Sequence, residues 1–182
     1  MAHWSERLSS ELIASDDRAR HLIAGLTAEQ LNWRPSPSAW SIGQCLEHLA
    51  IGSELYLPPM AKALRDKPPS AVPEITPGWF GRWFIASFIE PSSGTRRARA
   101  PRKIQPESRV DVSVLDRFLR SNQSVRELIL RARDHDVNRI RFANPFVTGI
   151  RFTVGTGLEI ISGHERRHLL QAERVRQSRD FR

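Results

Sequence analysis

The sequence lacks the features that stabilise secreted proteins or anchor proteins in membranes. Its 182 residues include one cysteine, Cys45, so the chain cannot form an internal disulfide framework. The N-terminal residues carry charge and contain no apolar core of a secretion signal. The most apolar stretch, residues 79–89, includes Arg82 and is too short to span a bilayer. We therefore expect a cytoplasmic protein that does not enter the membrane.

Motifs for nucleotide chemistry and for hydroxyl-based catalysis are also missing. The chain has no glycine-rich loop that would surround a phosphate, and no dinucleotide-binding fingerprint. No catalytic triad is recognisable around Thr27, Ser41 or Ser162. These absences argue against the nucleotide-binding and serine-hydrolase classes.

Positive charge is the most unusual property of the composition, with a net charge of +8. The excess lies in two groups: Arg96, Arg97, Arg99, Arg102 and Lys103; and Arg166, Arg167, Arg174, Arg176, Arg179 and Arg182. The last four fall near the end of a predicted helix, where positive charge interacts favourably with the helix dipole. Because no RNA- or DNA-binding motif accompanies the charge, nucleic-acid binding is the less favoured hypothesis.

Hydrophobic residues recur at helical spacing through most of the chain, and no stretch alternates convincingly as a strand. We predict long helices over residues 4–25, 41–66, 110–134 and 153–178, and short helices over 26–31 and 77–90. Thr27 with Gln30, and Ser41 with Gln44, form predicted capping boxes. We expect Pro58-Pro59 to kink or interrupt the second long helix. Residues 91–109 are predicted to form an extended basic loop.

These elements indicate an all-α fold, a four-helix bundle with an inserted aromatic segment. At roughly 100–200 residues per domain, residues 1–182 form a single domain.

His164 and His168 are the most informative residues for function. Four positions apart on a helix, their Cβ atoms lie roughly 5–6 Å apart on one face, so both rings can bind one metal ion. The pair lies on the apolar stripe of the last helix, whereas Glu165, Arg166 and Arg167 are expected on its polar side. Buried polar groups need partners, and a metal ion would supply one for both rings.

His48 is the candidate third ligand, because it lies beside the inward stripe of the second long helix. Three histidines would leave a fourth position for water or substrate, as in catalytic metal sites. The alternative is a core histidine bonded to a backbone carbonyl or to Gln44. Cys45 is a small core residue or, alternatively, a thiol near the metal. His3, His21 and His135 lack such neighbours and are interpreted as surface residues.

Gln44 and Gln171 are candidates to orient a histidine or a bound ligand from outside the coordination sphere. Both could equally make only local hydrogen bonds within their helices. Glu47 and Glu165 are possible proton shuttles, although their helical angles suggest that they face solvent.

Two stretches of the chain resemble the DinB/YfiT-like family of metalloenzymes. The first is LTAEQLNWRPSPSAWSIGQCLEHL at residues 26–49, followed by SELY at 53–56. The second is NPF at 144–146 with GHERRHLLQA at 163–172. Order and spacing agree from about residue 8 to 177. The basic insertion at residues 96–103 departs from the family pattern.

The resemblance implies an up-down-down-up bundle with a long crossover. It implies that His48, His164 and His168 hold a divalent ion, typically zinc or nickel, and that two chains pair as a homodimer. Some relatives are S-transferases or isomerases that use a low-molecular-weight thiol as cosubstrate.

The sequence therefore favours a metal-dependent enzyme acting on an unidentified small molecule, either a thiol-dependent S-transferase or a hydrolase. The alternative is a non-catalytic metal-binding stress or binding protein, in which the ion holds the bundle together.

Overall fold

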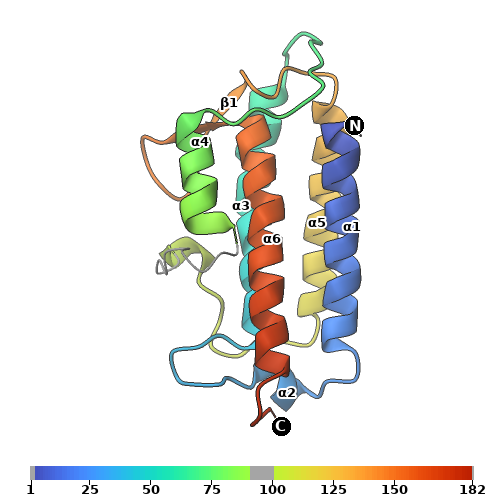
Figure 1. Ribbon diagram of the computed structural model, residues 1–182, viewed down its shortest axis with the longest axis vertical. Helices are drawn as coiled ribbons and strands as arrows, with labels where there is room; N and C mark the ends of the chain where they lie inside the picture. Colours follow the sequence, from blue (N-terminus) through green and yellow to red (C-terminus); the bar gives the residue numbers. More distant parts are fainter. Residues whose placement is uncertain (1–2, 91–100, 182) are drawn as a thin grey trace.

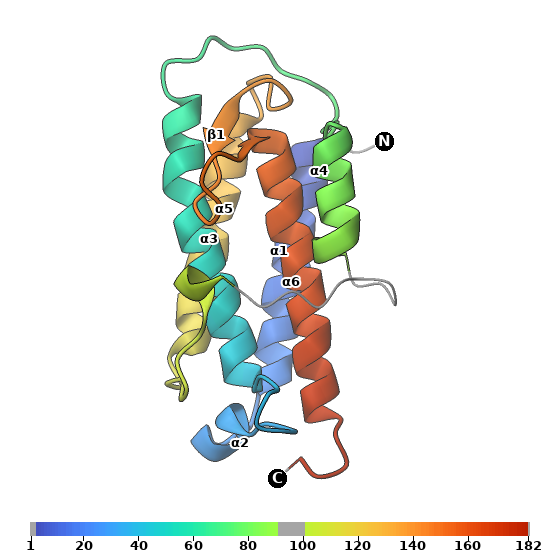
Figure 2. The same ribbon diagram turned by 90° about the vertical axis from the view of Figure 1, so that its left-hand side faces the viewer.

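The computed structural model describes residues 3–90 and 101–181, and the four longest helices in these ranges form a bundle. They are α1 (Trp4–Ile23), α3 (Ile42–Leu64), α5 (Val114–Ala132) and α6 (Val154–Arg176). Figures 1 and 2 show α1 and α6 running in one direction and α3 and α5 in the other. Helices α1 and α3 each pack against both α5 and α6. The predicted all-α bundle is confirmed.

A long connection joins the end of α3 to the start of α5 at the opposite end of the bundle (Figure 2). It contains α4 (Trp79–Phe84), the π-helical turn η1 (Ile85–Ile89) and the 3-10 turn η2 (Arg102–Ile104). The predicted aromatic helix is therefore present, although it is shorter and changes to π geometry. Much of the predicted basic loop, with Arg96, Arg97 and Arg99, lies outside the described residues.

Capping residues fix where several helices begin. The short helix α2 (Ala28–Asn32) and helix α3 both start with the predicted capping boxes. In each box the hydroxyl accepts from the backbone of the glutamine, and the glutamine side chain accepts from the backbone of the cap. Thr153 caps α6 through its hydroxyl.

One predicted helix boundary was wrong, and one predicted interruption is absent. Helix α3 continues without a break through Pro58 and Pro59, because buried Tyr56 and Met60 on either side hold it against the core. Helix α5 begins at Val114 rather than at residue 110. The reason is that the Asn32 side chain bonds both the amide and the carbonyl of Val110, at 2.7 and 2.9 Å, and keeps this backbone outside the helix.

A two-stranded hairpin precedes α6 and was not predicted. Strands β1 (Arg141–Ala143) and β2 (Arg151–Thr153) pair antiparallel, with Phe142 opposite Phe152. Three residues per strand are too few for an alternating pattern to be recognised in the sequence. Both phenylalanines are buried, and the rings of Phe80 and Phe84 from α4 pack on Phe152. The hairpin thus connects the aromatic helix to the start of α6.

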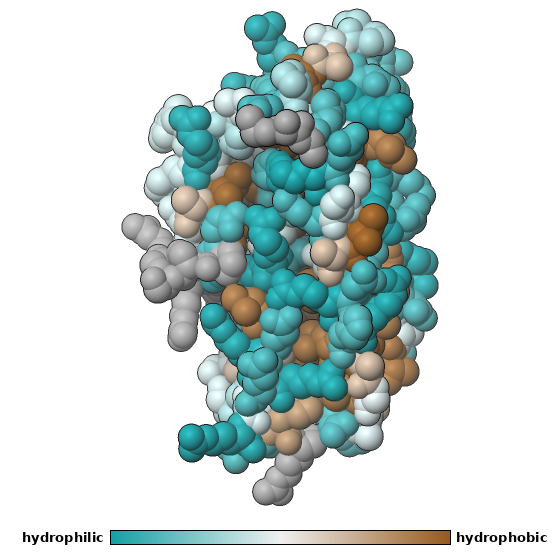
Figure 3. Space-filling model, turned by 45° about the vertical axis from the view of Figure 1, so that its right-hand side comes forward, coloured by the Kyte–Doolittle hydropathy of each residue, from teal (hydrophilic) through white to brown (hydrophobic). Residues whose placement is uncertain are grey.

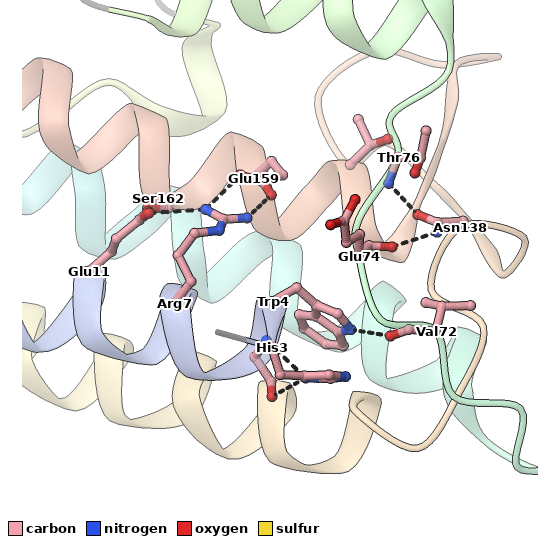
Figure 4. Close-up of polar contacts among 12 residues, drawn as sticks. His3, Trp4, Arg7, Glu11, Val72, Glu74, Thr76, Asn138, Glu159 and Ser162 are labelled. Carbon is pink, nitrogen blue, oxygen red and sulfur yellow. Dashed lines mark hydrogen bonds and ion pairs between the residues drawn. The ribbon is translucent and has the colours of Figure 1, made fainter. Parts of the chain in front are cut away.

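Polar contacts join α1 to α6 and anchor the connection (Figure 4). Arg7 of α1 pairs with Glu159 of α6, and Ser162 of α6 donates to Glu11 of α1. The indole of Trp4 donates to the carbonyl of Val72, at 3.0 Å. The side chain of Asn138 bonds the backbone of residues 74 and 76.

The core divides into two apolar clusters along the bundle, separated by a layer of buried polar residues. One cluster includes Trp4, Met60 and Leu128, and the other includes Leu22, Leu46 and Phe118. Between them the buried positions include Ser15 and Asp16 of α1, Gly52 and Ser53 of α3, Ser121 and Asn122 of α5, and Ser162, Glu165 and His168 of α6.

The face shown in Figure 3 is mostly hydrophilic, with separate hydrophobic areas. No helix in the described residues is both long and apolar enough to cross a membrane.

Candidate metal centre

Three histidines from two helices meet in the bundle interior. His48 lies on α3, and His164 and His168 lie one turn apart on α6. Their candidate ligand nitrogens all lie within 4.8 Å of one another, and Nε2 of His48 is 3.0 Å from Nε2 of His164. Two nitrogens that are each roughly 2.0–2.1 Å from one ion lie roughly 2.9–3.4 Å apart. The observed separation therefore fits two ligands of the same ion.

The orientation of His48 is fixed from outside the cluster. Its Nδ1 lies 2.6 Å from the carbonyl oxygen of Ile104 in η2. Because a carbonyl oxygen only accepts, Nδ1 carries the proton, and Nε2 presents a lone pair to the other rings. The backbone-carbonyl bond of the alternative interpretation is thus present, and the other nitrogen of His48 faces the histidines of α6.

His168 is oriented in the same way by Gln171. Its Nδ1 lies 3.0 Å from the amide oxygen of Gln171, one turn further along α6. A proton on Nδ1 leaves Nε2 of His168 directed to the cluster. Outer hydrogen bonds of this kind hold the ligand ring in one orientation in metal sites.

Gln44 bonds elsewhere, to the amide of Ser41 and to the carbonyl of Glu107, the latter at 2.8 Å. Glu47 accepts from the amide of the same Glu107, at 2.8 Å. Together with His48, these side chains hold residues 104–107 against α3. Gln44 therefore supports His48 indirectly, by fixing the segment whose carbonyl orients the ring.

Burial keeps the three imidazoles neutral. Desolvation lowers the pKa of all three rings and is the largest cause at each of them. The pKa of His48 is lowered, that of His164 lies well below its usual value, and that of His168 falls to about 3. The positive charge of Arg167 contributes to the lowering at His164 and His168. Neutral rings have the free lone pairs that metal binding requires. His48 and His168 are buried, whereas His164 keeps partial exposure.

Trp40 covers the cluster and was missed in the sequence analysis. Its ring centroid lies 4.6 Å from that of His48 and 5.6 Å from that of His168. Trp40 directly precedes the cap residue Ser41, so it lies at the start of α3, two turns from His48. This separation of two helical turns between Trp40 and His48 could have identified Trp40 as a neighbour of the cluster from the sequence.

Glu165 and Glu47 do not face solvent, contrary to the expectation from their helical angles. The exposed fraction is 1% for Glu165 and 8% for Glu47. Helix α6 packs against both α1 and α3, so two of its faces are buried rather than one. His164, Glu165 and His168 match the HExxH spacing of zinc proteases, in which the glutamate is the general base. Here Glu165 accepts from Asn122 of α5, at 3.3 Å, so it is directed away from the histidines.

The remaining candidates lie outside the cluster. Cys45 is fully buried in an apolar cluster, and burial raises the pKa of its thiol to about 12. It is the small core residue of the first interpretation. His3, His21 and His135 are at least partly exposed, and none joins the three-histidine group in the described residues.

A basic hollow of about 560 Å³ lies elsewhere on the protein. It is lined by Lys67, Arg139, Ile140, Arg141 and Arg151. Since it contains none of the three histidines, this concentration of charge is separate from the candidate metal centre.

The fold and the three-histidine cluster together define a helical-bundle protein with a candidate metal centre between two of its helices. The family model of the DinB superfamily matches residues 11–172, and the chain belongs to this family. Neither a curated protein nor a solved structure matches the chain.

Proposed function

We propose that His48, His164 and His168 bind one divalent metal ion, zinc or nickel, and that the chain is a metal-dependent enzyme. The observation that carries this proposal is the convergence of three neutral imidazoles, two of which are oriented by outer hydrogen bonds to Ile104 and Gln171. Histidine nitrogen suits both zinc and nickel.

Three protein ligands and the partial exposure of His164 leave room for a further ligand from solution. An ion in this site would lower the pKa of a thiol or a water molecule at that position. Cys45 cannot supply the thiol, because it is buried among apolar residues and its pKa is raised. A thiol must therefore come from a low-molecular-weight cosubstrate.

Within the enzyme class, the surroundings favour an S-transferase over a hydrolase. A hydrolase of this type needs a general base beside the nucleophilic water. Glu165 bonds Asn122 on the other side of α6, and Glu47 bonds the amide of Glu107. In the described residues no carboxylate bonds the histidines. A thiol, which ionises more easily than water, depends less on such a base.

The experiment compares two reactions of the zinc-loaded protein with those of the same protein after chelation. One is the alkylation of a small thiol by a model electrophile, and the other is the hydrolysis of a simple ester. We expect metal-dependent acceleration of the first reaction only. Acceleration of ester hydrolysis alone would favour the hydrolase, and acceleration of neither would favour a non-catalytic role.

The non-catalytic alternative has its own supporting observation, because the cluster joins α3 to α6 and an ion there would link two helices. Substitution of His168 by Ala separates the two roles. If the variant loses the ion and unfolds, the structural role is favoured. If it stays folded and loses thiol alkylation, the enzyme is favoured.

A further inference from the structure

Two consecutive arginines on α6 have opposite surroundings. Arg166 bonds Glu11 at 2.8 Å, Ser162 at 3.0 Å and Glu90 at 2.8 Å. Arg167 is half-buried and has no hydrogen bond or ion pair with any residue in 3–90 or 101–181. The sequence of residues 91–100 contains no acidic residue. Arg167 is therefore a partly desolvated cation for which the described residues provide no counter-charge.

Arg167 lies beside the candidate metal centre. It directly precedes His168 in α6, and its charge acts on the rings of both His164 and His168. Removing a cation from water without a partner costs free energy, so such a group is usually paired. The missing partner is consistent with a ligand that arrives from solution.

Acidic residues of α6, of α3 and of the connection before α5 already have partners. Glu165 bonds Asn122, Glu90 bonds Arg166, and Glu47 bonds the amide of Glu107. The site thus consists of three neutral imidazoles and one unpaired cation. Since neutral ligands do not reduce the double positive charge of an ion, both the ion and Arg167 would attract negative charge.

We propose that Arg167 binds a carboxylate on the thiol or substrate that the histidine centre takes, so that the preferred ligands are acidic thiols. This inference rests on the proposed metal site. The planar guanidinium donates two parallel hydrogen bonds to a carboxylate, which fixes the orientation of the bound molecule as well as its affinity. Arg167 is a specificity-determining residue in this account.

The experiment titrates the cobalt(II)-loaded protein with mercaptoacetate and 3-mercaptopropionate, and with the methyl ester of each acid. The visible spectrum of cobalt reports thiol binding without any need for turnover. We expect at least one acid to bind about tenfold or more tightly than its ester. This ratio of affinities corresponds to the free energy that one charge-assisted hydrogen bond contributes. Arg167→Met should remove the preference, and Arg167→Lys should keep part of it. Arg174→Met, at an exposed position of the same helix, should leave the preference unchanged.

The outcomes separate this inference from the proposed function. If the wild-type protein binds no cobalt, both are overturned. If cobalt and thiols bind but acid and ester bind equally, the role of Arg167 is overturned and the metal site stands. The same holds if the preference persists in Arg167→Met.

Discussion

Two groups of buried polar residues lie on α6, and they differ in how their charges are balanced. On one side His164 and His168 meet His48 of α3. On another side Glu165 meets Asn122 of α5 and Asp16 of α1. Asp16 accepts from Asn122 at 2.8 Å and from Arg126 at 2.7 Å. The second group, the carboxylate cluster (Asp16, Asn122, Arg126 and Glu165), contains its own counter-charge, whereas the histidine cluster contains none.

The difference shows which group has balanced charges without a ligand. In the carboxylate cluster one arginine faces two carboxylates, and burial raises the pKa of Glu165 to about 8. A proton on Glu165 at neutral pH balances the remaining charge. The histidine cluster groups its ring nitrogens around one point and lies near Arg167, which has no partner in the described residues. We therefore interpret the carboxylate cluster as structural and the histidine cluster as the functional site.

The largest effect on stability is expected in the carboxylate cluster. Asp16→Ala leaves Arg126 without its partner, and losing one member of a buried pair costs about 3–5 kcal/mol. We expect a loss of about 3 kcal/mol, because Arg126 keeps some exposure. Urea unfolding of the metal-free protein measures it. His48→Ala is the comparison and should cost less in the metal-free protein. A larger loss for His48→Ala would contradict the assignment of roles.

The next effect concerns metal affinity. Gln171→Ala removes the hydrogen bond that orients His168. Loss of such an outer bond weakens metal binding about 10–100-fold. Competition with a chromophoric chelator measures the affinity. Gln177→Ala, at the exposed end of the same helix, is the matched control and should bind metal as the wild type does. An unchanged affinity in Gln171→Ala would remove Gln171 from the site.

The third effect is a pH dependence of stability from Glu165. Its pKa in the folded state, about 8, lies above the usual 4.5, so the folded protein holds an additional proton between these values. The free energy of unfolding should therefore fall as pH rises from about 5 to 8, by at most about 1.4 kcal/mol per pH unit for one proton.

Glu165→Gln should remove this part of the slope, because its amide does not titrate. Glu6→Gln, at an exposed position, should keep the slope. Urea unfolding of the metal-free proteins at several pH values provides the comparison. Equal slopes for wild type and Glu165→Gln would show that Glu165 is already ionised in the folded protein.

The sequence predicted those parts of the structure that depend on local spacing. The separation of His164 and His168 and the pairing of Thr27 with Gln30 follow from helix geometry alone. The convergence of His48 with the α6 histidines depends on tertiary packing, which helical periodicity does not contain. The resemblance supplied that pairing.

The errors have the same origin. Glu165 looked exposed because a single apolar stripe was assumed for α6, although two neighbouring helices cover it. The short hairpin and the carbonyl of Ile104 on His48 depend on contacts between segments far apart in the chain. Such contacts leave no pattern in a single sequence.

The metal content of the purified protein tests the central claim most directly. Elemental analysis should find about one divalent ion per wild-type chain, and His48→Ala, His164→Ala and His168→Ala should each lose most of it. His21→Ala, on the exposed surface of α1, is the control and should keep the ion. A wild-type protein that binds no divalent ion after reconstitution, or full occupancy in any of the three variants, would contradict the account.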